Sequence, residues 1–146
     1  MKLRILHWAS RILLAFVFIY SGYTKLRSPL QFASAIEGYD LIPSALVLYV
    51  ADSLPWIEVA LGLLLLVGLK IRYIAAGAAA LLGFFIVILA ITYSRGIEAN
   101  CGCFGVGERI SPLTIARDAL FILPALFLAF EPWIGSRLRG PAASAD

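Results

Sequence analysis

The sequence predicts an all-α integral membrane protein, with four transmembrane helices forming one bundle and one domain over residues 1–146. Composition, hydropathy and segment length predict this class. The chain is 62% hydrophobic and only 14% charged, whereas soluble domains are nearer half apolar and a quarter charged. Its mean hydropathy is +0.93. Four apolar segments are long enough to cross a hydrocarbon core about 30 Å thick.

The first predicted span covers residues 5–24 and includes one charge, Arg11. A signal peptide would have a shorter apolar region and a small-x-small cleavage site, but this segment ends in Ser21, Gly22 and Tyr23. We therefore expect it to be retained as a membrane helix. Arg11 is expected to extend its charge toward the inner interface.

A short helix is predicted over residues 29–37, after the first span. Its start has the residues of an N-cap, a first-turn proline and a capping box, namely Ser28, Pro29 and Gln31. Apolar residues recur on one helical face at Phe32, Ile36 and Tyr39. The pattern favours a helix lying in the membrane interface, and a plain surface turn is the alternative.

The remaining predicted spans cover residues 44–68, 73–94 and 112–130. The span 73–94 has no charge and no proline. Its small residues predict close packing against neighbouring helices, and they are Ala76, Ala79, Ala80 and Gly83. Ser111 and Pro112 fit the start of the last span, which we expect to stop at Pro132. Pro55 and Pro124 lie inside their helices and predict kinks.

Positive charges predict the topology. An even number of crossings puts both termini on one side, and six Lys and Arg residues fall there: Lys2, Arg4, Lys70, Arg72, Arg137 and Arg139, or seven with Arg11. The opposite side has four, at Lys25, Arg27, Arg95 and Arg109. The positive-inside rule therefore predicts cytoplasmic N and C termini. The basic residues form no dense run, so no nucleic-acid partner is expected.

The connection between the last two spans is the strongest candidate for chemistry. It covers residues 95–111 and contains both cysteines of the chain, Cys101 and Cys103. Cysteines separated by one glycine can form a disulfide, and such a small ring is expected to be strained and labile. We expect the loop to face water, with Arg95 and Arg109 lowering a thiol pKa. The alternative is that both cysteines are small buried apolar residues.

A soft metal ion such as copper or mercury is a further alternative, because two thiolates suit such ions. The rest of the chain supports it less. Met1 is the one methionine and His7, the one histidine, is expected near the opposite face. With two cysteines and one histidine, the chain also lacks the ligands for a zinc site of four Cys and His residues. No metal is therefore expected.

Charges inside the predicted spans are costly in a membrane and are candidates for function. They are Asp52, Glu58, Arg117 and Asp118, besides Arg11. Depth along the helices puts Asp52 within reach of Arg117, and Glu58 level with Arg11. Asp52 and Glu58 lie about 120° apart around their helix, so they do not form a carboxylate dyad. These charges either support the cysteines, by tuning acidity or accepting protons, or form buried salt bridges.

Several motifs resemble one known family over nearly the whole chain. SGYTKL, SPLQFASAIEGYDLIP, LPWIEVALGL, CGCFG and the Arg117–Asp118 pair resemble the MauE family of methylamine-utilisation membrane proteins and their DoxX-like relatives. The resemblance implies a multi-pass protein of the bacterial plasma (inner) membrane, with the cysteine loop on the periplasmic side. By position, Cys101 and Cys103 match the family's cysteine pair. Glu58, Arg117 and Asp118 match its membrane charges.

The family members are implicated in maturation of methylamine dehydrogenase, whose small subunit needs disulfides and is served by a thioredoxin-like partner. The resemblance thus implies a membrane component of a periplasmic thiol–disulfide relay, possible as a thiol–disulfide oxidoreductase component. Cys101 and Cys103 would be its redox pair, with Glu58, Arg117 and Asp118 as supporting charges. Asp52 joins these charges because of its predicted depth beside Arg117. Expected partners are a thioredoxin-like periplasmic protein, its substrate, the lipid bilayer, and further subunits in a homo- or hetero-oligomer. A quinone between the kinked helices is a candidate electron acceptor. The alternative function is a non-catalytic assembly or anchor subunit.

Overall fold

The structure, a computed structural model, describes residues 1–104 and 107–138, with side chains up to Glu131. This part of the chain forms five helices: α1 (Lys2–Arg27), α2 (Pro29–Gly38), α3 (Ser44–Val67), α4 (Ile71–Ser94) and α5 (Pro112–Leu138). The prediction of an all-α membrane bundle is confirmed. Four helices are long and apolar enough to cross a membrane: Lys2–Arg27, Ser44–Val67, Ile71–Ser94 and Pro112–Glu131.

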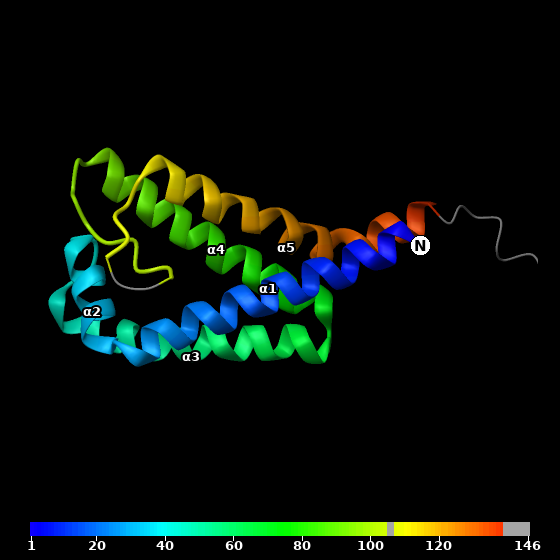
Figure 1. Ribbon diagram of the computed structural model, residues 1–146, viewed down its shortest axis with the longest axis horizontal. Coiled ribbons are helices and arrows are strands. Elements are labelled where there is room, and N and C mark those ends of the chain that lie inside the picture. The colour runs from blue at the N-terminus through cyan, green and yellow to red at the C-terminus, as the bar shows by residue number, and fades with distance from the viewer. Residues whose placement is uncertain (105–106, 139–146) are drawn as a thin grey trace, which may run out of the picture.

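Two antiparallel helix pairs make up the bundle, α1 with α3 and α4 with α5 (Figure 1). The short helix α2 and the connection between α4 and α5 lie together at one end, which we call the loop end. The α3–α4 turn lies toward the other end, where the N-terminus of α1 and the last turns of α5 extend beyond it (Figure 1). We call this the terminal end. His7 of α1 pairs there with Glu131 of α5.

Glycines allow α1 and α3 to pack closely. A Cβ atom on Gly22 would lie 2.6 Å from Val59 Cγ2 and 2.8 Å from the Pro55 carbonyl oxygen. A Cβ on Gly62 would lie 2.5 Å from Ile19 Cγ1. Real side-chain atoms do not approach so closely, so the two helix backbones could not meet at this distance with larger residues there.

Of the four small residues of α4 predicted to mediate packing, Ala79 packs against the core of this chain and the other three do not. Ala76 and Ala80 are exposed, and a Cβ on Gly83 would have no atom within 4 Å. Ala75 and Ala78 are fully buried instead, in the core cluster that includes Leu14, Leu65 and Leu128. Small residues occupy several faces of α4, so residue size alone did not identify the inward face.

The predicted starts of α2 and α5 are correct, but their capping differs. Ser28 is the N-cap of α2 and is followed by Pro29, yet its side chain makes no cap hydrogen bond, so the predicted capping box with Gln31 is wrong. At the start of α5 a reciprocal box does form. The Thr114 N–H donates to Ser111 Oγ at 3.2 Å and the Ser111 N–H donates to Thr114 Oγ1 at 2.9 Å, which satisfies amide groups that lack partners in the first turn.

The predicted end of the last helix is wrong, because α5 continues to Leu138. A proline inside a helix removes one backbone hydrogen bond without having to end the helix. Pro55 likewise lies inside α3. Of the cations counted for topology, Arg139 lies outside the described residues, and only the helical backbone of Arg137 is described.

The apolar face of α2 is buried as its periodicity predicts. Phe32 and Ile36 pack with Val47 and Ala51 of α3, and Tyr39, which follows the helix, is 4% exposed. The segment is therefore a helix and not a plain turn. It covers the loop end of the bundle.

Arg11 does not pair with Glu58. Its guanidinium donates to the carbonyl oxygens of Leu65 and Leu66, which are among the last of α3, just before Gly68 ends the helix with φ 79°. The depth estimate failed because α1 begins well beyond the terminal end of α3, so the two helices are offset along their axes. The charge does lie toward the terminal end, where it satisfies helix carbonyls that lack partners.

Candidate thiol site at the loop end of the bundle

The cysteine loop folds inward over the bundle. The Cys101 N–H donates to the Glu108 carbonyl at 2.6 Å and the Ile110 N–H donates to the Ala99 carbonyl at 3.1 Å, which closes the segment between them into a hairpin-like turn. Cys101 is 0% exposed and Cys103 is 8% exposed. The expectation that the cysteines face water is therefore wrong, because their side chains pack under the loop with Tyr39 and Leu89.

Tyr39 and Gly102 fix the loop against α2. The Tyr39 hydroxyl donates to the Cys101 carbonyl, and burial raises the pKa of this phenol well above its ordinary value, with the nearby thiols and Asp118 acting in the same direction. Gly102 has φ +67°, and a Cβ there would lie 3.1 Å from the Tyr39 hydroxyl oxygen. The left-handed backbone conformation favours glycine here, and a larger residue would also crowd the Tyr39 hydroxyl.

The two sulfurs lie beside each other. Both cysteines are free thiols, and the two Sγ atoms are 2.7 Å apart. The hydrogen bond from the Cys103 thiol lowers the pKa of Cys101. The same hydrogen bond, together with burial, raises the pKa of Cys103. Cys101 is therefore the thiol that ionises first.

Arg95 and Arg109, which were expected to lower a thiol pKa, make contacts elsewhere. Arg95 donates to the Asp40 carbonyl at 3.2 Å and pairs with the Asp40 carboxylate at 3.4 Å. Arg109 forms an isolated bridge with Asn100 through the backbone. Cys101 acidity depends first on Cys103, which sequence proximity to the arginines did not indicate.

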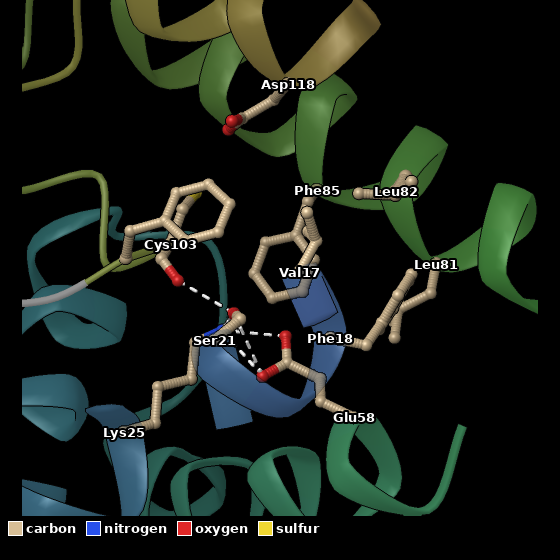
Figure 2. Close-up of a pocket in the computed structure, with 11 residues that line it drawn as sticks. Val17, Phe18, Ser21, Lys25, Glu58, Leu81, Leu82, Phe85, Cys103 and Asp118 are labelled. Atoms are coloured by element: carbon tan, nitrogen blue, oxygen red, sulfur yellow. Dashed lines mark hydrogen bonds and ion pairs between the residues drawn. The ribbon is translucent and has the colours of Figure 1, made fainter. Parts of the chain in front are cut away.

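A buried ion pair supports the loop from below. Lys25 Nζ donates to Glu58 Oε1 and Oε2 at 2.7 and 2.8 Å, and to Ser21 Oγ at 2.7 Å. Ser21 Oγ in turn lies 2.7 Å from the Cys103 carbonyl oxygen, to which it donates (Figure 2). Lys25 and Glu58 are 3% exposed each. One hydroxyl thus connects the α1–α3 ion pair to the backbone of the cysteine loop.

A second charged group borders the sulfurs from α5. Arg117 Nε donates to Asp118 Oδ1 at 3.1 Å, and Arg117 Nη1 donates to Glu108 Oε1 of the loop at 2.6 Å. Asp118 Oδ2 lies 3.9 Å from Cys101 Sγ. Asp118 is 4% exposed, so a carboxylate faces the thiols in a nearly dry environment.

Asp52 is not part of the site. It is exposed on α3, and the predicted pair with Arg117 is wrong, because Arg117 pairs with Glu108 and Asp118. The separation around the helix that excluded a dyad with Glu58 also explains this result. When one of the two carboxylates faces the bundle interior, the other is directed away from it.

The chain is similar to known proteins over most of its length. Residues 3–131 match the family model described as "Methylamine utilisation protein MauE". The chain belongs to the MauE family. It is 36% identical over 125 residues to the methylamine utilization protein MauE of Paracoccus denitrificans, covering 84% of this chain and 66% of that protein. The identity to the protein of the same name from Methylophilus methylotrophus is 35% over 121 residues, covering 81% and 60%.

The MauE-family chain therefore spans about two thirds of the length of the curated relatives that it matches. The match and the four apolar helices together identify a membrane protein of a family named for methylamine utilisation. No solved structure matches the chain.

Four residues of this MauE-family site were not predicted as functional: Ser21, Lys25, Tyr39 and Glu108. A signal for the first two was present. Ser21 and Lys25 are four residues apart, so they share one face of α1. Tyr39 was assigned to an apolar face only. Glu108 meets Arg117 because the loop folds back onto α5. Residue spacing within a helix cannot predict a contact of this kind.

The site of the MauE-family chain encloses a small pocket. It has a cavity volume of about 30 Å³ and is bordered by residues of all four long helices and of the loop, among them Ser21, Glu58, Leu82, Cys103 and Asp118 (Figure 2). One water needs about 10–15 Å³ measured this way. The pocket therefore has room for about two or three waters and excludes a ligand of ring size.

Proposed function

We propose that this MauE-family protein is the membrane component of a periplasmic thiol–disulfide relay that supports maturation of a partner protein in methylamine metabolism. The observation that carries the proposal is the pair of free sulfurs 2.7 Å apart. A disulfide is about 2.05 Å long, so side-chain rotations without rearrangement of the helices suffice to join them.

The relay oxidises a partner dithiol. A thiolate of the partner attacks the Cys101–Cys103 disulfide and forms a mixed disulfide with one cysteine, which frees the other as a thiolate. The partner's second thiolate then attacks the partner sulfur of the mixed disulfide. The partner leaves with its own disulfide formed, and the cysteine of this protein is released as a thiolate. Two electrons stay on Cys101 and Cys103, which take up two protons. The partner class is a thioredoxin-like periplasmic protein or its substrate.

Regeneration of the disulfide needs a two-electron acceptor, and a quinone of the bilayer fits this need. The dithiol would give two electrons and two protons, becoming a disulfide while the quinone becomes a quinol. The pocket beneath Cys103 is too small for the ring. A second pocket of about 140 Å³ with an entirely apolar lining lies between α2, α3 and α4, and is bordered by Phe32, Tyr39 and Phe84. Tyr39 lies between this pocket and Cys101, which it also contacts.

Trapping a mixed disulfide tests the relay. Cys103→Ser cannot form the internal disulfide, but Cys101, the more acidic thiol of the wild-type pair, can attack the disulfide of the oxidised partner and stay bonded to one partner sulfur while the other leaves as a thiolate. A disulfide-linked adduct with a periplasmic protein should therefore accumulate, detected by non-reducing electrophoresis and mass spectrometry. Cys101→Ser should accumulate less. Asp52→Asn, at an exposed carboxylate away from the sulfurs, is the matched control and should leave both cysteines in place and form no adduct.

One observation favours the second candidate, a non-catalytic assembly or anchor subunit. Both cysteines are buried, so a partner reaches them only if the loop or the α2 cover moves. Under this alternative, replacing both cysteines by serine leaves maturation of the partner complete, provided that the variant reaches the membrane at the wild-type level. Under the relay, the same double variant abolishes maturation.

A further inference from the structure

We propose that the reduced cysteines and Asp118 form a binding site for one thiophilic divalent cation of the Zn²⁺ class. Cys101, Cys103 and Asp118 are all buried, and one ligand atom from each lies within 4.8 Å of the other two. Two thiolates and a carboxylate are a recognised donor set for zinc, with the remaining position filled by water. The site does not depend on the relay, since it requires the thiols and not their oxidation.

The third ligand distinguishes this site from the copper or mercury reading of Cys-Gly-Cys alone. Soft monovalent copper prefers sulfur donors, whereas a carboxylate oxygen beside two thiolates favours a borderline cation such as Zn²⁺. Asp118 comes from α5, 15 positions beyond Cys103. Only the folding of the loop onto the helix brings the oxygen to the sulfurs.

The distances fit after small side-chain rotations. Zinc bonds of about 2.3 Å to sulfur and about 2.0–2.2 Å to oxygen imply ligand separations of about 3.5–3.8 Å at tetrahedral angles. Cys101 Sγ and Asp118 Oδ2 are already 3.9 Å apart. The two sulfurs, at 2.7 Å, would have to separate by about 1 Å. The pocket beside Cys103 and Asp118 has room for the water ligand.

The Asp118 carboxylate is oriented by a hydrogen bond to one of its oxygens, as carboxylates that bind metals commonly are. Asp118 Oδ1 accepts from Arg117 Nε, and Arg117 is itself anchored by Glu108 of the loop. Asp118 Oδ2 is left facing the thiols, and Figure 2 shows the side chain projecting from α5 toward the side of the pocket where Cys103 lies. Hydrogen bonds to the ligand's other oxygen fix its orientation.

Charge provides the driving force. Two thiolates and a carboxylate without a cation would be strongly unfavourable in so buried a place. A divalent ion neutralises most of this charge, and Arg117 lies against the rest. Each thiol loses its proton on binding, so two protons are released for each ion bound.

Cadmium titration tests the site, because Cd²⁺ shares the ligand preferences of Zn²⁺ and its thiolate bonds absorb in the ultraviolet. The full-length protein in detergent, reduced with a phosphine, should bind one Cd²⁺ with a thiolate-to-metal charge-transfer band and release two protons. Zn²⁺ should displace it. Cys101→Ser with Cys103→Ser should abolish the band, and Asp52→Asn should titrate as wild type.

Asp118 carries the distinctive part of the proposal. Asp118→Asn should weaken Cd²⁺ binding by at least about 10–100-fold, the loss seen when even an outer-sphere partner of a metal ligand is removed. Should that variant not fold, Asp118→Cys offers a third thiolate, which should strengthen binding and intensify the band. Unchanged affinity in Asp118→Asn, unchanged affinity in Asp118→Cys, or no binding by the reduced wild type would each overturn the proposal.

The metal-binding test and the relay test can fail independently of each other, so their outcomes are distinguishable. Absence of Cd²⁺ binding with a trapped mixed disulfide would leave the relay and remove the metal site. Cd²⁺ binding with no adduct and complete partner maturation would do the reverse.

Discussion

Lys25 and Glu58 are the residues at which a single change should be most damaging, because each holds the other's charge in a buried place. Glu58→Gln leaves an unpaired ammonium, for which we expect a loss of about 3–5 kcal/mol in the free energy of unfolding. Lys25→Met should cost a similar amount. Lys25→Met combined with Glu58→Gln should cost less than the sum of the two single variants, as measured by unfolding in detergent.

The Arg95–Asp40 pair provides the control for this cycle. Its side chains are 42% and 82% exposed, and exposed pairs contribute about 0–1 kcal/mol. Arg95→Met should therefore change stability little. If the Lys25 and Glu58 variants proved equally mild, the buried pair would not be what fixes the loop end.

Tyr39 should give the site a distinct pH dependence at high pH. Its pKa is raised by burial, whereas a tyrosine in the unfolded chain ionises near pH 10. Its protonated form therefore contributes stability that is fully present below about pH 10 and is lost as the pH rises further. Alkaline difference absorbance of the folded protein should therefore contain no contribution from Tyr39 near pH 10.

Tyr39→Phe tests this prediction. The folded variant should show the same tyrosinate amplitude as wild type, and its stability should decline less steeply above pH 10. It should also lose about 1–3 kcal/mol at neutral pH, because the buried Cys101 carbonyl loses its donor. A smaller amplitude in the variant would mean that Tyr39 ionises normally.

At the scale of the elements, the α1–α3 contact depends on Gly22 and Gly62. Gly22→Ala should destabilise the bundle, since the new methyl group would overlap both Val59 and the Pro55 carbonyl. Overpacking of this kind costs about 1–3 kcal/mol. Gly62→Ala should behave alike, again by unfolding in detergent.

Gly83→Ala is the matched control, because a Cβ at this position on α4 meets no atom within 4 Å. It exchanges one glycine of a membrane helix for alanine without a clash, so stability should be unchanged or slightly higher. Equal losses at Gly22 and Gly83 would contradict close α1–α3 packing.

Helix positions were largely predictable from the sequence, and the contacts between helices were not. Local chemistry marks the start or extent of three elements: the uncharged segment 73–94, the first-turn proline Pro29 and the cap residue Ser111. The offset of α1 against α3 has no local signal, so the depth estimate puts Arg11 level with Glu58 although the two do not pair. An offset is set by side-chain packing along the whole contact.

For the whole molecule, the orientation of the bundle in the membrane gives a testable prediction. The positive-inside rule predicts the loop end on the periplasmic side. In a variant with both native cysteines replaced by serine, Asp40→Cys should react with a membrane-impermeant maleimide in intact cells. Asp40 lies at the loop end and Leu69 at the α3–α4 turn, and both are well exposed. Leu69→Cys should react only after the membrane is opened.

The opposite labelling pattern would put the cysteines in the cytoplasm, where thiols are kept reduced. It would remove the periplasmic relay and leave the metal site untouched, because metal binding needs only the reduced thiols. The labelling result therefore decides between oxidising and reducing surroundings for the pair.

The sequence by itself determined that this chain has four helices able to cross a membrane and that both of its cysteines fall in the connection between the last two, because hydropathy, helix caps and residue type are local properties. Tertiary structure alone decided that the cysteines are buried, that Lys25 and not Arg11 neutralises Glu58, and that Asp118 faces the sulfurs. These outcomes depend on the relative offset and rotation of packed helices and on the inward fold of a glycine-rich loop. Such long-range geometry is encoded by many weak contacts together and not by the spacing of a few residues.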